Sequence, residues 1–291
     1  MSDVKGCLFV VSTPIGNLKD LSQNAKECLS SVDLIAAEDT RNSKVLINHI
    51  GSKVKMISHH KFNEESSTLK IIEELKSGKN VALITDAGTP CISDPGSILV
   101  NEAIKNNIDV FSVPGACAVI SALTVSGFNI NSFTFYGFLP RETGKLSKKL
   151  NEIKHDSSLV AVLYESPKRI KKLLKLIIDI LDNPKICLCN ELTKKFEKKY
   201  YGYSSSVLEL LNQSNVSELG EYVLVIRKNE IKNDNENKTS LESQIIDKMV
   251  KENITIKDAI EKIKSENESL SKKEIYDASL RLKSILLKNA K

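Results

Sequence analysis

Short apolar runs alternate with segments of helical periodicity through the first half of this chain. Short runs rich in Val, Ile and Leu are typical of buried strands, and apolar residues three or four positions apart predict helices with one buried face. The alternation favours a parallel or mostly parallel sheet with helices on both faces. The strands predicted here are 7–11, 33–37, 54–57, 81–84 and 110–113, and the helices are 22–31, 43–49, 67–76, 97–105 and 116–126.

The second half repeats this alternation. Residues 133–138 alternate with strand period, and we place a boundary after them, between an α/β domain at 1–139 and a second α/β domain at 140–229. Asn, Glu, Lys and Asp dominate 230–240, which indicates a flexible linker. Three amphipathic helices predicted in 241–291 form a helical appendage, which could bind nucleic acid, dimerise or cap the fold. The elements predicted are strands 159–164, 186–191, 200–203 and 222–226, and helices 145–153, 168–181, 205–211, 241–250, 256–263 and 275–287.

One connection is much longer than a strand-to-helix turn requires. The segment from Thr85 to Gly96, called the central loop below, contains two Gly, two Pro, two Asp, two Thr and one Ser. Such turns usually need only about 2–6 residues. Gly88 would let the backbone approach a ligand closely, and Pro90 would stiffen it. We therefore predict a ligand loop at the carboxyl end of a strand, with an elaborate structural loop as the alternative.

Composition places the chain among ordinary globular proteins. Its 291 residues are enough for two domains, and the apolar and charged fractions are 41% and 27%. No apolar run is long enough to span a membrane, and the start lacks the features of a signal peptide, so we expect a cytoplasmic protein with no membrane association. The six cysteines form no C-x-x-C pair, and none of the four histidines lies beside a cysteine at metal-ligand spacing. We expect reduced thiols and no metal site.

Positive charge gathers in the second half. The whole chain has a net charge of +5, whereas residues 141–203 contain fifteen Lys or Arg and eight Asp or Glu, a difference of +7. Aromatic residues lie beside several of these lysines. This pattern predicts a face that binds a polyanion, although a solvated lysine-rich surface would look the same.

Several common sites are disfavoured because their motifs are absent. The chain has no G-x-G-x-x-G, no G-x-x-x-x-G-K-[ST] and no G-x-S-x-G. A dinucleotide Rossmann site, a P-loop and a serine hydrolase triad are therefore unsupported. The remaining candidates for a ligand site are the polar loops that follow the predicted strands, at 12–17, 38–41, 58–61, 85–96, 114–118, 164–169 and 190–195.

A set of motifs, in order and at compatible spacing, covers nearly all of residues 7–227. The motifs lie at 12–20, 36–41, 85–96, 113–115, 136–140, 164–169 and 190–194. Through them the chain resembles the tetrapyrrole methylase superfamily, and within it the RsmI-type ribosomal RNA methyltransferases. The chain has Cys91 and Cys117 where relatives commonly have small residues or Ser, and both departures look tolerable.

The resemblance implies two α/β domains with S-adenosylmethionine in the cleft between them, and a homodimer. The segments that reach the cofactor in relatives correspond here to strand ends and to the central loop. Taken singly, Ala118, Val119 and Leu192 would be interpreted as core residues. The cofactor-binding residues implied are Pro14, Ile15, Asp86, Gly88, Thr89, Ile92, Ala118, Val119, Tyr164, Leu192 and Tyr222.

The reaction implied is 2′-O-methylation of a cytidine ribose in the decoding region of 16S rRNA, with the small ribosomal subunit as partner. Methyl transfer depends on aligning the acceptor oxygen with the methyl group, and a positioned carboxylate or histidine would help to remove the hydroxyl proton. His59 and His60 are weaker candidates for that role. The catalytic candidates are Glu38, Asp39, Arg41 and Glu191, with structural ion pairing as the alternative, and the RNA-binding candidates are Arg141, Lys168, Arg169, Lys194, Lys198 and Lys199.

Two other functions remain open. A methyltransferase of the superfamily could act on a small molecule such as a tetrapyrrole, which would predict a less basic second domain. A non-catalytic RNA-binding factor in ribosome assembly could have kept the fold, but the run from Asp86 to Pro90 is intact and favours cofactor binding.

Overall fold

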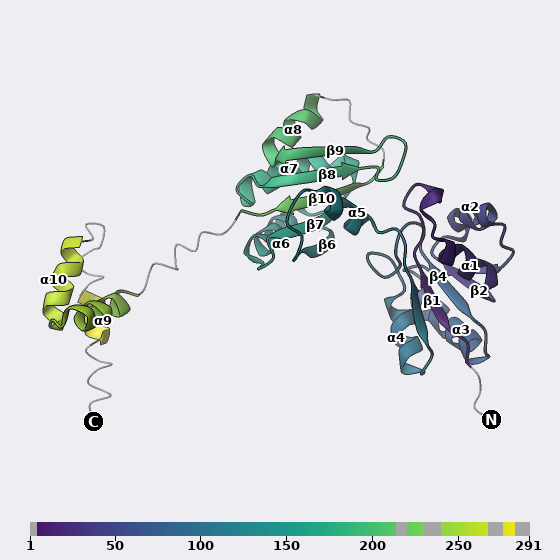
Figure 1. Ribbon diagram of the computed structural model, residues 1–291, viewed down its shortest axis with the longest axis horizontal. Helices are drawn as coiled ribbons and strands as arrows, with labels where there is room; N and C mark the ends of the chain where they lie inside the picture. Colours follow the sequence, from purple (N-terminus) through teal and green to yellow (C-terminus); the bar gives the residue numbers. More distant parts are fainter. Residues whose placement is uncertain (1–4, 214–219, 230–239, 267–275, 283–291) are drawn as a thin grey trace. The chain divides into compact units, whose positions relative to one another are not determined.

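Two five-stranded sheets make up most of the structure, a computed structural model that describes residues 5–213, 220–229, 240–266 and 276–282 (Figure 1). The chain divides into two units, Met1–Asn229, which contains both sheets, and Glu230–Lys291, whose described residues are mostly helical. Each unit has its own hydrophobic core, so each is described by itself.

The first sheet is entirely parallel, with strand order β3-β2-β4-β1-β5. Its central strands β2 and β4 are buried along their whole length. Continuous apolar runs are expected in strands that are covered on both faces. The strands are β1 (Leu8–Val11), β2 (Leu34–Ala37), β3 (Lys55–Ser58), β4 (Val81–Ile84) and β5 (Val110–Val113).

Helices cover both faces of this sheet, as the alternating pattern predicts. The helices α1 (Gln23–Ser31) and α2 (Thr40–Ile50) pack on one face. The helices α3 (Glu64–Lys76) and α4 (Ser97–Lys105) pack on the other. A short 3-10 helix, Leu18–Asp20, precedes α1. This arrangement brings the loops that follow all five parallel strands to one edge of the sheet.

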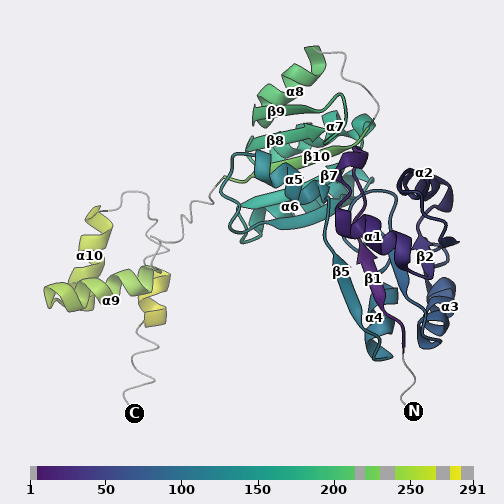
Figure 2. The ribbon, with the colours of Figure 1, turned by 45° about the vertical axis from the view of Figure 1, so that its right-hand side comes forward.

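The second sheet has the order β6-β7-β10-β8-β9. Three helices pack on one face and α5 packs on the other. Figure 2, turned from the view of Figure 1, shows the same grouping of helices around this sheet. The elements are α5 (Ala118–Val125), β6 (Thr134–Phe138), α6 (Thr143–His155), β7 (Val160–Glu165), α7 (Pro167–Ile180), β8 (Lys185–Asn190), β9 (Lys198–Tyr203), α8 (Ser204–Gln213) and β10 (Tyr222–Arg227).

The change from the first sheet to the second comes earlier than the predicted boundary after residue 139. Strand β6 pairs with β7 in the second sheet, and Val119 and Leu123 of α5 pack on that sheet. The change therefore falls between β5 and α5. Strand period at 133–138 is the same whichever sheet receives the strand, so the pattern could not assign it.

The second sheet is also less parallel than the alternation suggests. Only β6 and β7 pair in parallel, whereas β10 is antiparallel to β7 and β8, and β8 is antiparallel to β9. The connection from β8 to β9 is a loop with no helix in it, and such a loop joins antiparallel neighbours.

The second unit is a small bundle of helices. It contains α9 (Leu241–Glu252), α10 (Ile256–Glu266) and helical residues at 276–282, packed around a core formed by Ile245, Ala259, Ile263, Ala278 and Leu282. Ser240 caps the amino end of α9 by accepting a hydrogen bond from the Ser243 amide. The rest of the predicted linker, and both ends of the predicted helix 275–287, lie outside the described residues. No helix in the described part of the chain is long and apolar enough to cross a membrane.

Candidate functional site

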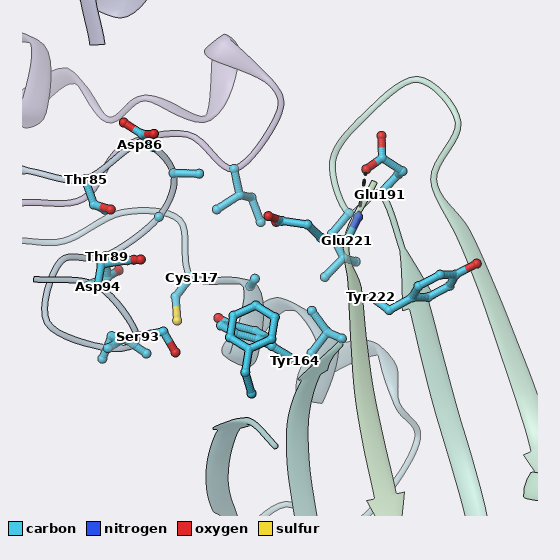
Figure 3. Close-up of a pocket in the computed structure, with 18 of the residues that line it drawn as sticks. Thr85, Asp86, Thr89, Ser93, Asp94, Cys117, Tyr164, Glu191, Glu221 and Tyr222 are labelled. Atoms are coloured by element: carbon cyan, nitrogen blue, oxygen red, sulfur yellow. Dashed lines mark hydrogen bonds between the residues drawn. The ribbon is translucent and has the colours of Figure 1, made fainter. Parts of the chain in front are cut away.

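A cavity of about 280 Å³ lies between the strand ends of the two sheets (Figure 3). On the first-sheet side its wall comes from the central loop and from the ends of β1 and β2. On the second-sheet side it comes from β6, β7, β10 and the loop after β8. The central loop therefore does face a cavity, at the carboxyl end of β4.

The start of the central loop is fastened to the end of β1. Thr13 and Gly88 exchange two backbone hydrogen bonds, of 2.8 and 3.1 Å. The Thr89 hydroxyl lies 2.9 Å from the Ser12 hydroxyl and donates to the Ala116 carbonyl at 3.1 Å. Gly88 has a φ of +86°, and a Cβ there would lie 3.3 Å from Cγ2 of Ile15, so a side chain would press on the cavity wall.

Two acidic side chains connect the loop to β2 and α2. Glu38 accepts hydrogen bonds from the Thr85 hydroxyl at 2.7 Å and from the Asp86 amide at 3.3 Å. Asp86 accepts one from the Asp39 amide at 3.2 Å and one from the Asn42 side chain at 2.8 Å. A carboxylate at the amino end of a helix is favoured by the helix dipole, so Asp86 is well placed at the start of α2.

The far end of the loop is held from α3. Glu64 accepts a hydrogen bond of 2.8 Å from the amide of Gly96, the residue that precedes α4. Gly96 has a φ of +130°, and a Cβ there would lie 2.6 Å from Cδ2 of Leu83. Both ends of the loop are thus fixed by other elements, which restricts the backbone between them.

On the second-sheet side an ion pair within the loop after β8 lies close to Gly16 of the first-sheet side. Lys194 lies 2.8 Å from Glu191, and the Glu221 amide donates to the same Glu191 oxygen at 3.3 Å. A Cβ on Gly16 would lie 2.4 Å from Cγ of Lys194, and one on Gly220 would lie 2.1 Å from the Glu191 carboxylate. Glycine is required at both positions because the ion pair occupies the space beside them.

Aromatic rings form the apolar wall. Tyr164 of β7 contacts Phe135 edge-on, with ring centroids 5.0 Å apart, and Phe138 at 5.4 Å. Burial raises the pKa of Tyr164, so its hydroxyl keeps its proton at neutral pH. Phe138 and Ile92 also line the cavity, yet they are 58% and 46% exposed, which places them at its mouth.

Acidic groups outnumber basic ones in the lining. Burial and repulsion from Glu38 are the two largest causes that raise the pKa of Asp94 to about 6, and Asp86 and Glu221 add to the repulsion. A cavity with this excess of carboxylates fits a ligand that carries positive charge. The ionisable acids are Glu38, Asp86, Asp94, Glu191 and Glu221, against Lys194 as the one lysine or arginine in the lining.

Most of the cofactor-binding residues predicted from the sequence line this cavity. Those that do are Ile15, Asp86, Gly88, Thr89, Ile92, Ala118, Tyr164, Leu192 and Tyr222. Pro14 is not among the lining residues, and Val119 lies in the core beneath the second sheet. The Tyr222 ring points away from the cavity (Figure 3), and its buried hydroxyl has no hydrogen-bond partner among the described residues.

The catalytic candidates divide into two pairs. Glu38 and Glu191 line the cavity, whereas Asp39 and Arg41 do not. Arg41 is paired with Asp39 at 2.7 Å and its side chain is 88% exposed. Hydrogen bonds from Arg41 hold the pKa of Asp39 at about 2. For this pair the structure shows the ion pairing that the sequence left open as the alternative.

The histidine candidates do not reach the cavity lining. His59 is buried, and its Nδ1 lies 2.7 Å from the Ser67 hydroxyl on α3. Burial lowers the pKa of His59, which favours the neutral ring. The His60 amide donates to the Asn63 side chain at 2.7 Å. Both residues belong to the junction between β3 and α3.

The RNA-binding candidates differ from one another in their surroundings. Arg169 donates to the Leu139 and Pro140 carbonyls at 3.2 and 3.0 Å and lies 3.3 Å from Glu165, so it supports the loop after β6. Lys199 is ion-paired with Glu197, and Lys194 lines the cavity. The exposed cations among the candidates are Arg141, Lys168, Lys198 and Lys199.

Several lining residues were not singled out from the sequence. Ser93 and Asp94 lie in the central loop, whose composition could have included them. Phe138 lies within a motif of the resemblance, and Cys117 was noted only as a departure from relatives. For Glu221 the sequence holds no signal, since it reaches the cavity only because β10 inserts between β7 and β8. The lining residues that were not singled out are Thr85, Ala87, Ser93, Asp94, Cys117, Phe138, Glu221 and Val223.

No cluster of three or more potential metal ligands occurs among the described residues.

Solved structures share this fold. The uroporphyrin-III-C-methyltransferase of Thermus thermophilus matches with a TM-score of 0.55 at 16% identity, covering 76% of this chain and 94% of that one. A diphthine synthase matches with a TM-score of 0.57 at 15% identity, covering 76% and 89%. At these identities the similarity establishes the fold alone.

The sequence comparisons find relatives of higher identity than these structures. The family model for tetrapyrrole (corrin/porphyrin) methylases matches residues 7–207. The ribosomal RNA small subunit methyltransferase I of Bacillus subtilis is 39% identical over 277 residues, covering 94% of each chain. The protein of the same name from Haemophilus influenzae is 38% identical over 260 residues, covering 89% of this chain and 91% of its own. The chain therefore belongs to the tetrapyrrole methylase family, in the group of proteins named ribosomal RNA small subunit methyltransferase I.

Proposed function

We propose that this protein uses S-adenosylmethionine to methylate the 2′-hydroxyl of a cytidine ribose in the decoding region of 16S rRNA. The relatives at 38–39% identity are named as ribosomal RNA methyltransferases and match nearly the whole chain, which supports a methyltransferase that acts on small-subunit rRNA. The observation that carries the proposal is the acidic cavity between the sheets, part of whose wall is the central loop.

The residues present fit the proposed cofactor. S-adenosylmethionine carries a positive sulfonium and an ammonium group, and the excess of carboxylates in the lining suits both. Gly88 and Thr89 would bring backbone groups to the ligand, and Ile15, Ala118 and Leu192 would supply an apolar wall. When bound there, the cofactor supplies a methyl group that is activated for displacement.

The protein's part in the reaction is to position the reactants and exclude water. The hydrogen bonds that fix the central loop hold one wall in place before any ligand arrives, which reduces the entropy lost on alignment. The contact between the rings of Tyr164 and Phe138 supplies part of the apolar wall. A carboxylate in the lining would accept the acceptor's proton.

The direct test is transfer of labelled methyl from S-adenosylmethionine to small ribosomal subunits that lack the modification, with naked rRNA and a tetrapyrrole mixture in parallel. We expect label on a cytidine ribose of the subunit rRNA. Label only on a tetrapyrrole would establish a small-molecule methyltransferase. Binding to subunits without cofactor consumption would indicate an assembly factor.

A homodimer and a cytoplasmic location are also proposed, from the family resemblance. Light scattering of the purified protein would give its mass in solution, and twice the chain mass is the expected value. Fluorescence of a tagged chain in its own cells would give the location.

A further inference from the structure

Three of the five carboxylates in the cavity have strong partners. Glu38 and Asp86 accept the hydrogen bonds that fix the central loop, and Glu191 pairs with Lys194. Asp94 has only the Thr85 hydroxyl as a side-chain partner among the described residues, and Thr85 donates its single hydrogen to Glu38 at 2.7 Å. Asp94 therefore retains free capacity to accept a proton.

Asp94 lines the first-sheet side of the cavity. It is half-buried in the central loop, directly after Ser93. A Cβ on Gly137 would lie 3.5 Å from the Ser93 hydroxyl, so this part of the loop meets the end of β6. The next residue is the exposed Phe138, at the mouth of the cavity.

The charges around Asp94 are mostly of its own sign. Glu38 faces it from the end of β2, Asp86 from the central loop and Glu221 from the residue before β10. Tyr164 of β7 and Cys91 of the loop are the neutral titratable neighbours. Repulsion and burial together raise the pKa of Asp94 to about 6, which leaves it mostly ionised, yet more basic than an ordinary aspartate, at neutral pH.

We propose that Asp94 is the general base that takes the proton from the acceptor hydroxyl. This proposal rests on the proposed function. The hydroxyl oxygen forms the new bond to the methyl carbon, whose bond to sulfur breaks and leaves its electron pair on sulfur. The hydroxyl proton goes to a carboxylate oxygen of Asp94, which later releases it to water.

Three of the other lining carboxylates are less suited to this role. A base works best when its pKa is close to the operating pH, because it must be ionised and still bind the proton firmly. Glu38 and Asp86 already accept the hydrogen bonds that fix the central loop. Glu191 is already engaged in its ion pair with Lys194.

The test compares wild-type protein with Asp94→Asn in the methyl-transfer assay on small subunits, across a range of pH. For wild type we expect kcat to rise with pH through an acid limb that reports ionisation of the base. Asp94→Asn should lower kcat by at least about 100-fold and abolish that limb. Calorimetric binding of S-adenosylhomocysteine, which lacks the sulfonium charge but keeps the ammonium group, should change by less than about threefold, because the base does not hold the cofactor.

Glu221→Gln is the matched control. It removes a carboxylate from the same cavity but leaves Asp94 in place. We expect this variant to shift the acid limb to lower pH, whatever its effect on kcat, because one source of repulsion on Asp94 is gone. A residue with a purely structural role at position 94 would not produce such a shift.

The failures are distinguishable. If wild type methylates rRNA while Asp94→Asn keeps its kcat and its acid limb, Asp94 is not the base although the proposed function stands. If wild type methylates no RNA, the proposed function fails and the assignment of Asp94 falls with it. Should Asp94→Asn not fold, Glu221→Gln decides, since an unshifted acid limb would overturn the proposal.

Discussion

At the scale of single residues, backbone conformations that are rare for side-chain-bearing residues occur in two of the loops that line the cavity. Cys91, Glu191 and Thr193 have positive φ values of 70°, 53° and 66°. A β-branched residue such as Thr193 is seldom found there, and such a conformation costs about 1–3 kcal/mol. The turn that contains Glu191 and Thr193 brings Lys194 against Glu191, so the strain accompanies a lining feature.

Gly88 offers a test at this scale. Gly88→Ala would place a Cβ 3.3 Å from Ile15 at a φ of +86°, which should move the loop and weaken binding of S-adenosylhomocysteine by at least about tenfold. Gly51→Ala is the control, because Gly51 has a φ of +73° and nothing within 4 Å of its Cβ position. It should lose about 1–2 kcal/mol of stability and keep its affinity. Equal loss of affinity in both variants would contradict the placement of the ligand at Gly88.

At the scale of elements, four helices and strands hold the central loop in place. Its first residues are fixed to the ends of β1 and β2 and to the start of α2, and its last residue is fixed to α3. A loop with both ends tied loses less conformational entropy when it binds a ligand than a free loop of the same length. The helices and strands of the first sheet thus act on the cavity through this loop.

Glu64→Ala tests the connection from α3. It would leave the Gly96 amide without its acceptor, and we expect a loss of about 1–3 kcal/mol in the free energy of unfolding, together with weaker binding of S-adenosylhomocysteine. Glu65→Ala removes the same charge from the first turn of α3, but Glu65 is exposed. That control should change stability by less than about 0.5 kcal/mol. Urea denaturation measures both, and identical losses would assign the effect to helix charge alone.

At the scale of the whole molecule, the acidic cavity contrasts with a basic second half. Residues 141–203 carry an excess of seven positive charges, while the cavity lining carries an excess of carboxylates. Under the proposed function, the basic surface would hold the RNA backbone and the acidic cavity would receive the cofactor and one ribose.

The salt dependence of RNA binding tests this division. Lys198 is exposed, whereas the charge of Lys199 is compensated by Glu197. Lys198→Ala should reduce the slope of log K against log salt by about 0.7–0.9, and Lys199→Ala should reduce it less. Lys70→Ala, an exposed lysine of α3, is the control. An unchanged slope for Lys198→Ala would remove that residue from the interface.

Much of the fold was predictable because the local periodicity of apolar and polar residues indicates the strands and helices. The strands 81–84 and 110–113 and the helix 97–105 were predicted with the bounds that the structure shows. Buried strands and one-sided helices leave their period in the sequence whatever they pack against. The central loop was recognisable for a similar reason, since its length and composition exceed what a turn needs.

What the pattern could not decide depends on pairing between distant segments. The period of β6 is the same in either sheet, so its place beside β7 follows only from packing. The same holds for Asp94, whose pKa is raised by burial and by repulsion from Glu38 and Glu221 in distant segments, and for Arg41, which is paired with Asp39 outside the cavity. Local periodicity therefore established the elements and the ligand loop, while tertiary structure alone decided which acidic groups share the cavity, because strand order and electrostatic neighbourhood arise only when distant residues meet.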